Sequence, residues 1–270
     1  MLSTELMRNQ LSKYGTWGMV AGAAQGLGAA FVENLAIQGK NVIMIDRNET
    51  ELKQIAIKVE KKYSIKTHPL ILDLSDLNNL DEITKILINL NCRLFIYNAA
   101  YGPVKPFMEN TTEELDYYID LNSRMPLHLI SKFLQSRKNE KPAGIIIMSS
   151  LAGLWGTQLV VPYGATKAFD YNLAEGLYYE LKSRKVDVLG CIAGAIDTPN
   201  YRSTQPKKNL IGPSIMKPDT VARKALSKLS KKPVYIPGFF NQFTYFLFTR
   251  IFPRSIATAM MNRTMDKMYN

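Results

Sequence analysis

Strand-length apolar runs alternate along this chain with longer segments in which apolar residues recur at helical spacing. The predicted strands are Trp17–Ala21, Asn41–Ile45, Thr67–Leu72, Leu94–Tyr97, Gly144–Met148, Val186–Cys191 and Val234–Ile236. The predicted helices are Leu27–Gln38, Glu49–Tyr63, Leu77–Asn89, Glu113–Arg137, Tyr163–Ser183 and Asp219–Leu229. Such alternation is typical of βα units. We therefore expect an α/β fold, doubly wound (Rossmann), with a parallel seven-stranded sheet and helices on both faces.

The composition does not divide the 270 residues into two hydrophobic units, so we expect one domain over residues 1–270. Pro126 predicts a kink or break in the fourth helix, because proline cannot donate the helical hydrogen bond. Residues 199–216 contain Pro206, Gly212 and Pro213 without clear periodicity, which predicts an irregular loop that serves as a substrate lid. Residues 234–270 are predicted to form an apolar and basic C-terminal extension.

Positive charge is concentrated in the last part of the chain. The net charge is +11, and from Tyr201 to Asn270 there are 13 Lys and Arg against two acids, Asp219 and Asp266. This asymmetry fits an anionic partner or substrate, and equally a solvated basic surface. Nucleic-acid binding is not expected, because no readable motif interleaves basic and aromatic residues.

The C-terminal extension is also rich in aromatic residues. They are Tyr235, Phe239, Phe240, Phe243, Tyr245, Phe246, Phe248 and Phe252. Its uninterrupted apolar stretch is too short to span a bilayer. Two interpretations remain open, a helix that packs in the core or against another subunit, and a segment that touches a membrane surface.

The two cysteines, Cys92 and Cys191, lie beside predicted strands and are expected to be buried thiols. The two histidines are isolated, and no Cys/His cluster has the spacing of metal ligands, so no metal site is expected. The first 14 residues lack the apolar stretch of a signal peptide. A cytoplasmic protein is predicted, with peripheral membrane contact left open.

Three glycines directly follow the first predicted strand. They stand in the run Gly22-Ala-Ala-Gln25-Gly26-Leu27-Gly28, where the first predicted helix begins. Glycines let the backbone turn sharply and approach a pyrophosphate at the helix N-terminus. The spacing is GxxxGxG, which differs from the GxGxxG fingerprint. Taken alone, the triplet is also compatible with a simple tight turn.

The second predicted strand ends at Asp46 and Arg47, and Asp46 lies 18 residues beyond Gly28. An acid near this spacing can accept hydrogen bonds from the adenosine ribose hydroxyls. Its charge repels a 2′-phosphate by on the order of 1 kcal/mol or more, which favours NAD over NADP. Gln25 adds no positive charge to oppose this preference. Arg47 complicates it, because a guanidinium can clamp a phosphate.

Further along the chain stand the motifs Asn98-Ala-Ala, Ser150, Tyr163-Gly-Ala-Thr-Lys167 and Ala193-Gly194…Thr198. Together with the glycines they resemble the short-chain dehydrogenase/reductase superfamily over nearly the whole chain, and more loosely its hydroxysteroid and 3-oxoacyl reductase branch. The resemblance implies an NAD(P)-dependent oxidoreductase that interconverts an alcohol and a carbonyl, with Tyr163 as the proton-transfer residue. A Tyr-xxx-Lys pair alone would more often be two neighbours on a helix surface.

The spacing of Tyr163 and Lys167 agrees with that role, because residues i and i+4 share one helix face. A phenol with a pKa of about 10 needs roughly 4 kcal/mol of preferential phenolate stabilisation to act near neutrality. An ammonium at about 4 Å supplies roughly this amount at an effective dielectric constant near 20.

Other roles rest on the resemblance. It assigns Ser150 the hydrogen bond to the substrate oxygen, although Ser149 and Ser150 also fit the start of a loop, and Asn122 a water beside the lysine. Further cofactor contacts are implied for Gln25, Leu27, Asp73, Leu74, Asn98, Lys167, Gly194, Ile196 and Thr198. Three positions depart from the family's pattern: Ala21 replaces threonine, Ala100 replaces glycine and Ala193 replaces proline.

We therefore expect an enzyme that uses a nicotinamide cofactor on a small, apolar alcohol or carbonyl, lipid-like, acyl-like or steroid-like. The alternative is a non-catalytic sensor or scaffold of the same fold, because the fold alone does not imply turnover. The combined presence of Asn122, Ser150, Tyr163 and Lys167 argues against that alternative. A homo-oligomer, either a dimer or a tetramer, is expected.

Overall fold

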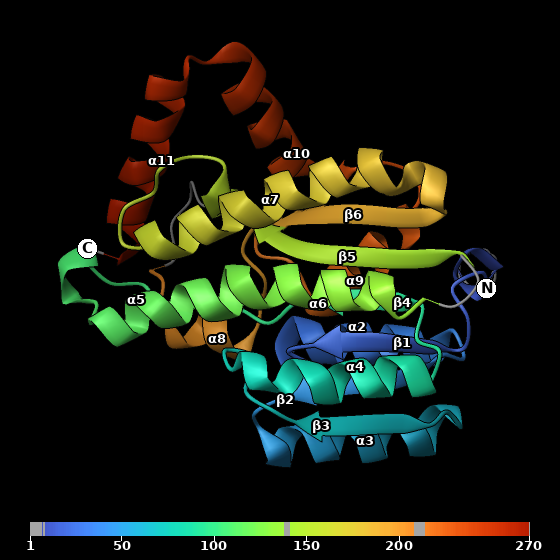
Figure 1. Cartoon of the computed structure of the whole chain (residues 1–270). Coiled ribbons are helices and arrows are strands. Elements are labelled where there is room, and N and C mark those ends of the chain that lie inside the picture. The colour runs from blue at the N-terminus through green and yellow to red at the C-terminus, as the bar shows by residue number, and fades with distance from the viewer. Residues whose placement is uncertain (1–6, 8, 138–140, 208–213, 270) are drawn as a thin grey trace.

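The computed structural model describes residues 7, 9–137, 141–207 and 214–269. Its centre is one parallel sheet of seven strands in the order β3-β2-β1-β4-β5-β6-β7 (Figure 1). The strands are β1 (Trp17–Ala21), β2 (Asn41–Asp46), β3 (Thr67–Ile71), β4 (Leu94–Tyr97), β5 (Ala143–Ser150), β6 (Val186–Ala193) and β7 (Val234–Tyr235). The predicted fold class is confirmed, and each predicted strand is present with ends that differ by at most two residues.

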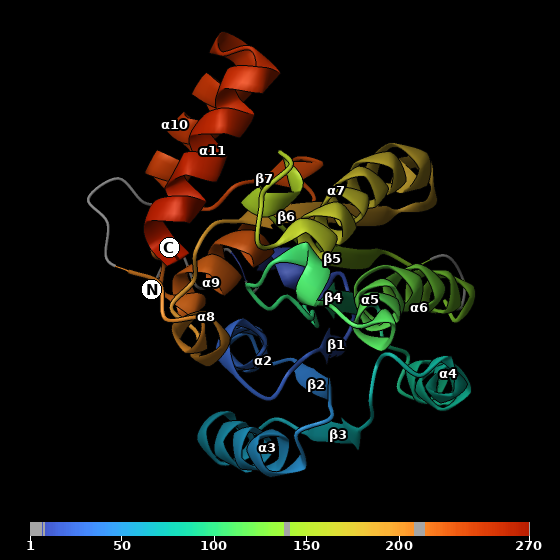
Figure 2. The ribbon, with the colours of Figure 1, turned by 90° about the vertical axis from the view of Figure 1, so that its left-hand side faces the viewer.

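Helices cover both faces of the sheet (Figure 2). One face carries α2 (Gly26–Ile37), α3 (Glu49–Tyr63) and α9 (Pro218–Lys228). The other carries α4 (Leu80–Asn89), α5 (Thr112–Ile119), α6 (Met125–Gln135) and α7 (Val161–Leu181). Because the sheet is covered on both sides, its central strands are apolar at nearly every position, as buried parallel strands require.

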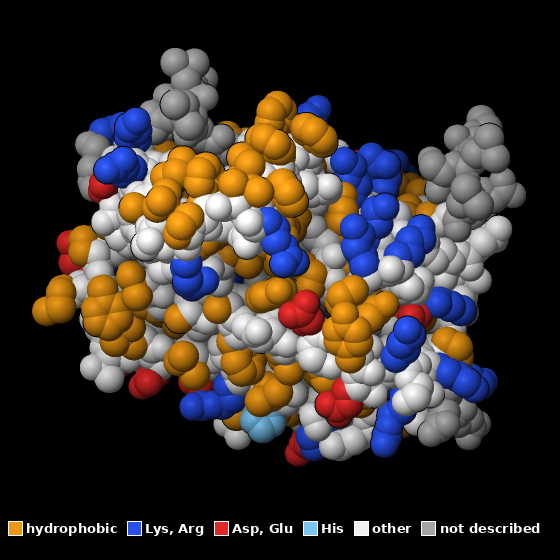
Figure 3. All heavy atoms as spheres, turned by 90° about the horizontal axis from the view of Figure 1, so that it is seen from above, with side chains coloured by type: hydrophobic (Ala, Val, Ile, Leu, Met, Phe, Trp, Pro, Cys, Tyr) orange, Lys and Arg blue, Asp and Glu red, His pale blue; other side chains and the backbone are white. Residues whose placement is uncertain are grey.

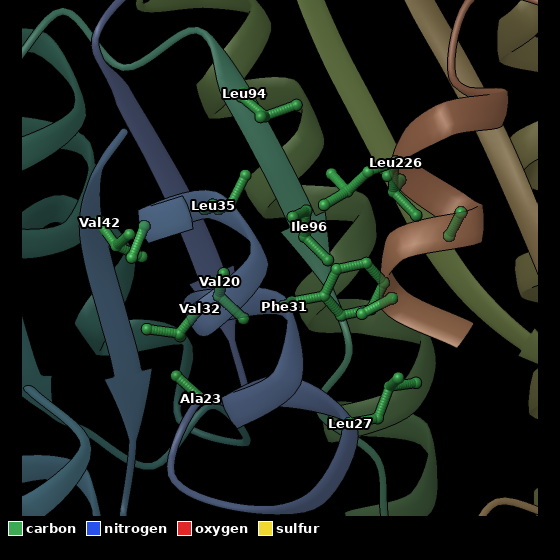
Figure 4. Close-up of a cluster of buried hydrophobic side chains, with 14 of the residues drawn as sticks. Val20, Ala23, Leu27, Phe31, Val32, Leu35, Val42, Leu94, Ile96 and Leu226 are labelled. Atoms are coloured by element: carbon green, nitrogen blue, oxygen red, sulfur yellow. The ribbon is translucent and has the colours of Figure 1, made fainter. Parts of the chain in front are cut away.

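Successive residues of the central strands belong to two separate hydrophobic clusters, one on each face of the sheet, because side chains alternate between the faces of a strand. Val20 and Ile96 pack with Phe31 of α2 on one side (Figure 4). Met19 and Phe95 belong to the cluster on the other side. Cys92 and Cys191 are buried free thiols, as predicted.

The predicted break at Pro126 is confirmed. Between α5 and α6 the chain forms a π-helical segment, Asp120–Arg124, and Pro126 stands in the first turn of α6. Proline has no N–H for the carbonyl of residue 122 four positions earlier, so the α-helical ladder cannot continue through it. The irregular turn places Asn122 behind the end of β4.

Residues 199–216 differ from the predicted irregular loop. The segment begins with a short helix, α8 (Pro199–Ser203), whose N-terminus is capped by the Thr198 Oγ1, which accepts a hydrogen bond from Tyr201 N at 3.2 Å. Met216 pairs with Ile196 in an isolated parallel bridge. The prediction was wrong for these parts because it overlooked a threonine cap followed by proline, a common helix start. Residues 208–213 lie outside the described residues.

The C-terminal extension forms two helices, α10 (Phe239–Phe246) and α11 (Arg254–Tyr269), joined by a π-helical segment, Leu247–Ile251. Figures 1 and 2 both show this hairpin standing out beyond the sheet, on the side of β6 and β7. Within the described part of the chain, no helix is both long and apolar enough to cross a membrane.

Candidate active site

The carboxyl ends of β1, β2, β4, β5 and β6 meet at one edge of the sheet, where a cavity of about 1340 Å³ opens. Parallel open sheets bind their ligands at this edge. Fifteen of the predicted site residues line the cavity: Gly22, Gln25, Gly26, Leu27, Asp46, Arg47, Asp73, Leu74, Asn98, Ser150, Tyr163, Lys167, Gly194, Ile196 and Thr198. The other two, Gly28 and Asn122, are buried behind its wall.

At each of the three glycine positions, the backbone conformation or a close neighbour disfavours a residue with a Cβ. Gly22 and Gly26 have positive φ angles of 75° and 56°, which residues with a Cβ rarely adopt. A Cβ on Gly22 would lie 2.7 Å from the backbone of Ala99, and a Cβ on Gly28 would overlap the carbonyl oxygen of Gly22. The N-terminus of α2 begins at Gly26 and carries no side-chain cap or acidic residue. The first N–H groups of α2 therefore have no side-chain cap, and Gly26 and Leu27 line the cavity, where an uncapped helix N-terminus can bind an anion such as pyrophosphate.

Asp46 and Arg47 lie at the far end of the glycine loop. The Asp46 carboxylate accepts hydrogen bonds from Ala24 N and Asn48 N, both at 3.0 Å. Arg47 Nη1 donates to the Tyr117 hydroxyl at 2.8 Å and lies 3.6 Å from Asp73 Oδ2. The carboxylate is thus held at the cavity, and the guanidinium is drawn toward α5.

Asn98 connects two strands at the centre of the site. It follows β4, and its Nδ2 donates to the Gly22 carbonyl at 3.0 Å. The bond ties the end of β4 to the glycine loop after β1. The shape of that loop thus depends on a side chain 76 residues farther along the chain.

Tyr163 and Lys167 lie one turn apart on α7, and the Lys167 Nζ is 5.8 Å from the centroid of the Tyr163 ring. Gly102 is packed against this ring, since a Cβ there would come within 2.5 Å of it. The lysine side chain is only 2% exposed. Its ammonium donates to the Met148 carbonyl at 3.0 Å and to Asp170 Oδ2 at 2.8 Å.

Asp170 was not among the predicted site residues. It is fully buried and pairs with Lys167, and the pKa values of both groups depart from their ordinary values. Burial disfavours the ionised carboxylate and raises the pKa of Asp170, although Lys167 acts in the opposite direction. Burial also opposes the charge of Lys167, but attraction to Asp170 and Tyr163 outweighs it and raises the pKa of this lysine.

The two serines at the end of β5 have different partners. Ser149 is buried, and its hydroxyl donates to the Lys167 carbonyl at 2.7 Å. Ser150 Oγ accepts a hydrogen bond from Ala152 N at 3.2 Å. Among the described residues, the Ser150 hydroxyl hydrogen has no acceptor. Ser150 is therefore the serine that can donate to a ligand in the cavity.

Asn122 is fully buried and makes three hydrogen bonds through its side chain. Its amide exchanges two bonds of 2.8 Å with the backbone of Tyr101, and its Nδ2 also donates to Thr166 Oγ1 at 3.0 Å. The side chain thus braces the loop after β4 against α7. The predicted contact of Asn122 with a water beside the lysine is not tested by this geometry.

The wall opposite the glycine loop comes from the C-terminal hairpin, which the sequence interpretation did not place in the site. The hairpin lines the cavity with Phe243, Leu247, Phe248, Met260, Met261, Met265 and Met268. It is held against the loop after β5: the Trp155 and Phe248 rings meet edge to face at 5.5 Å. Asn262 Oδ1 accepts from Gln158 N at 2.8 Å. In the sequence, the high density of methionine and aromatic residues in the C-terminal extension was the feature that could have indicated an apolar cavity wall.

The described part of residues 199–216 closes the remaining side. Thr204 lies 3.1 Å from the Tyr269 hydroxyl, and Lys207 N donates to the Met268 carbonyl at 2.9 Å. This segment and α11 therefore form one continuous rim. The predicted lid function stays a prediction.

Comparisons with known proteins agree with this geometry. The sequence matches the family of short chain dehydrogenases over residues 17–209. The chain belongs to this family. This short-chain dehydrogenase is accordingly an oxidoreductase that transfers hydride between a nicotinamide cofactor and an alcohol or carbonyl.

Two relatives in sequence are informative about this short-chain dehydrogenase. It is 26% identical to a 7beta-hydroxysteroid dehydrogenase of Clostridium sardiniense over 234 residues, covering 87% of this chain and 90% of the relative. It is 33% identical to a very-long-chain 3-oxoacyl-CoA reductase of Pyricularia oryzae over 187 residues, covering 66% of this chain and 56% of that reductase.

Solved structures of similar shape confirm the fold. A 7beta-hydroxysteroid dehydrogenase studied for its stereoselectivity has a TM-score of 0.84 and 24% identity, covering 93% of this chain and 98% of the other. A short-chain dehydrogenase from Sphingobium yanoikuyae in complex with NADPH has a TM-score of 0.74 and 22% identity, covering 93% and 95%.

Proposed function

We propose that this short-chain dehydrogenase interconverts an apolar alcohol and its carbonyl form, with Tyr163 as the general acid and base. The observation that carries the proposal is the shared cavity. Tyr163 and Ser150 face it between the glycine loop on one side and the methionine- and phenylalanine-rich hairpin on the other. Cofactor and apolar substrate would thus meet at the tyrosine hydroxyl.

In the proposed reaction, each residue at the cavity has a separate role. When bound, the nicotinamide cofactor supplies or accepts the hydride. The Tyr163 hydroxyl gives a proton to the substrate oxygen during reduction and takes it back during oxidation. Ser150 donates a hydrogen bond to the same oxygen, and the ammonium of Lys167 favours the phenolate through its positive charge. Asn122 holds the loop after β4 against α7.

For the cofactor, the proposal favours NAD over NADP. The glycine loop fits a dinucleotide, because a Cβ at Gly22 or Gly28 would clash with the backbone of Ala99 or of Gly22, and a loop this tight lets its backbone approach a pyrophosphate. The Asp46 carboxylate is held at the cavity by two backbone N–H groups, which favours hydrogen bonds with ribose hydroxyls over a 2′-phosphate. Arg47, the group that would bind this phosphate, is already engaged by Tyr117 and Asp73.

For the substrate, the proposal is a lipid-like, acyl-like or steroid-like compound. The hairpin wall offers thioether and phenyl groups that pack against bulky apolar surfaces and adapt to irregular shapes. Trp155 and Val160, on the loop before α7, add buried apolar surface beside Tyr163. The relatives named for steroid and very-long-chain acyl substrates support the same class.

The proposal also includes a cytoplasmic location with peripheral contact at an anionic membrane surface, and a homo-oligomeric state. Viewed from the side of the hairpin, hydrophobic side chains lie next to Lys and Arg (Figure 3). Phe239 and Phe240 on α10 are 78% and 68% exposed. Aromatic rings favour the membrane interface, and basic residues near an anionic surface contribute about 1 kcal/mol each. The same exposed rings could instead pack against a second subunit.

The test of the proposed function is a turnover screen. The purified protein is incubated with NAD, NADH, NADP or NADPH and with panels of hydroxysteroids, hydroxyacyl thioesters and apolar secondary alcohols or their ketones. We expect turnover with at least one class, lost by at least 10²-fold in Tyr163→Phe, since general acid–base catalysis contributes about that much. The cofactor dissociation constant should stay within a few-fold.

The matched control is Tyr179→Phe, a change on the same helix at a side chain that is 67% exposed. This variant should keep full activity. Cofactor binding without turnover on any panel would favour the non-catalytic sensor or scaffold. Wild-type kcat in Tyr163→Phe would refute the mechanism.

A further inference from the structure

A buried carboxylate stands directly behind the proposed reaction centre. Asp170 lies on α7, one turn beyond Lys167 and two turns beyond Tyr163. Its side chain is 0% exposed, and its Oδ2 accepts a hydrogen bond from Lys167 Nζ at 2.8 Å. It lies behind the cavity wall, so that a substrate or cofactor in the cavity reaches Lys167 and not Asp170.

Stability does not explain this pair. Desolvating two charges costs several kcal/mol per ion, and well-packed apolar residues often replace a buried ion pair without loss of stability. Asp170 carries an additional cost, because its Oδ1 is buried with no hydrogen-bond partner among the described residues. Perturbed buried charges beside a cleft are instead typical of functional sites.

The charged surroundings of Asp170 are simple. On its own helix it faces Lys167, which in turn interacts with Tyr163. Tyr97 of β4 is the titratable group that approaches from the sheet; its hydroxyl donates to the Leu121 carbonyl, and burial and then Asp170 raise its pKa. In the described part of the chain, β5 contributes an uncharged group to the pair, the Met148 carbonyl, which accepts a hydrogen bond from Lys167.

We propose that Asp170 is a positioning residue that holds the Lys167 ammonium and offsets part of its positive charge at Tyr163. This inference rests on the proposed function of Tyr163. Two of the three ammonium hydrogens are committed to Met148 and Asp170, which leaves one for a ligand in the cavity that Lys167 lines. The nearby negative charge opposes the attraction that the ammonium exerts on a phenolate at Tyr163. A protonated tyrosine is the form that reduction of a carbonyl requires.

The first test is the pH dependence of kcat/KM for alcohol oxidation, which requires the phenolate. Asp170→Asn removes the charge and keeps an oxygen acceptor for Lys167. Lys167 Nζ lies 2.8 Å from Asp170 Oδ2 and 5.8 Å from the centroid of the Tyr163 ring, so the carboxylate is within about 9 Å of the ring. A unit charge at this distance shifts a titration midpoint by about one pH unit at an effective dielectric constant near 20. We expect the midpoint to fall by about this amount. An unchanged or raised midpoint would overturn the inference.

The matched control is Asp187→Asn. Asp187 also pairs with a lysine, Lys13, at 2.7 Å, but it lies at the start of β6, at the opposite edge of the sheet. Its removal should leave the midpoint unchanged. If it shifts the midpoint as Asp170→Asn does, the effect is one of overall charge and the inference fails.

The second test needs no turnover. The ionisation of Tyr163 is followed by ultraviolet absorbance. Its contribution is the titration of the wild-type chain minus that of Tyr163→Phe. The same difference is then measured between Asp170→Asn and the double variant Asp170→Asn, Tyr163→Phe. The midpoint should again fall by about one pH unit. This result would support the role of Asp170 even if the turnover screen failed, so the two proposals can fail separately.

Folding is checked by circular dichroism and urea unfolding for each variant. If Asp170→Asn does not fold, Asp170→Ser, which also removes the charge, is titrated in its place with the same expected shift. If both neutral variants fail to fold while Asp170→Glu folds, the carboxylate is required for the fold, and the proposed role at Tyr163 is withdrawn.

Discussion

Replacing Gly28 by alanine tests whether the glycine loop is built as tightly as the structure indicates. Gly28 lies in the first turn of α2, where a Cβ would overlap the Gly22 carbonyl oxygen and lie 3.0 Å from Asn98 Nδ2. These two atoms are the acceptor and donor of one hydrogen bond. Overpacking costs about 1–3 kcal/mol, and the better helix propensity of alanine returns about 1 kcal/mol.

We therefore expect Gly28→Ala to lower the free energy of unfolding by up to about 2 kcal/mol, measured by urea unfolding. The loop must also move, so the dissociation constant of the cofactor should rise at least about tenfold, equivalent to 1.4 kcal/mol, by calorimetric titration. The matched control is Gly176→Ala on α7, where a Cβ would meet no atom of the described residues within 4 Å. It should raise the free energy of unfolding by about 0.5–1 kcal/mol and leave cofactor binding unchanged. Cofactor affinity within twofold of wild type in Gly28→Ala would refute this account of the loop.

Three further outcomes are expected. Asp46→Ala should raise the ratio of kcat/KM with NADP to that with NAD by about tenfold, because one charge repulsion is removed; a wild-type enzyme that already strongly prefers NADP would contradict this. Lys105 is the main cause that lowers the pKa of Glu114 to about 2, so this pair stabilises the fold at neutral pH and the stabilisation is lost as pH falls from about 4.5 toward 2. Glu114→Gln should flatten the dependence of Tm on pH in that window, and an unchanged slope would exclude the pair as its source. The wild-type chain should co-sediment with anionic vesicles at low salt and not at high salt, whereas a variant with serine at Phe239, Phe240 and Phe246 should stay in the supernatant. Ile57→Ser on α3 is the control, and absence of the wild-type chain from the pellet would assign the hairpin to subunit packing.

Local patterns were sufficient to predict the fold. Each strand is a short apolar run, and Pro126 marks the helix break through its missing N–H. The glycine loop was also predictable, because its glycines directly follow β1 and precede α2. The cavity lies at the predicted edge because parallel strands bring their carboxyl ends together.

Features that depend on contacts between distant segments could not be predicted from local patterns. In the sequence, Asp170 looks like an ordinary polar residue on a helix, and only the packing of α7 against β5 shows that it is buried with Lys167. Asn122 was selected by resemblance, but its three bonds depend on the path of the loop around Tyr101. The hairpin wall depends on the docking of Asn262 against the loop before α7, about a hundred residues earlier in the chain.

The residues proposed for the reaction and the residues that shape the substrate space lie in different parts of this chain. The proposed cofactor and proton-transfer residues end at Thr198, whereas the apolar wall opposite them begins after Gly238. Substitutions in α10 and α11 can therefore reshape the space offered to a substrate while leaving Tyr163 and the glycine loop as they are. Duplicated copies of such a gene could diverge in the compounds they accept while the reaction itself is retained, through changes confined to about thirty consecutive residues.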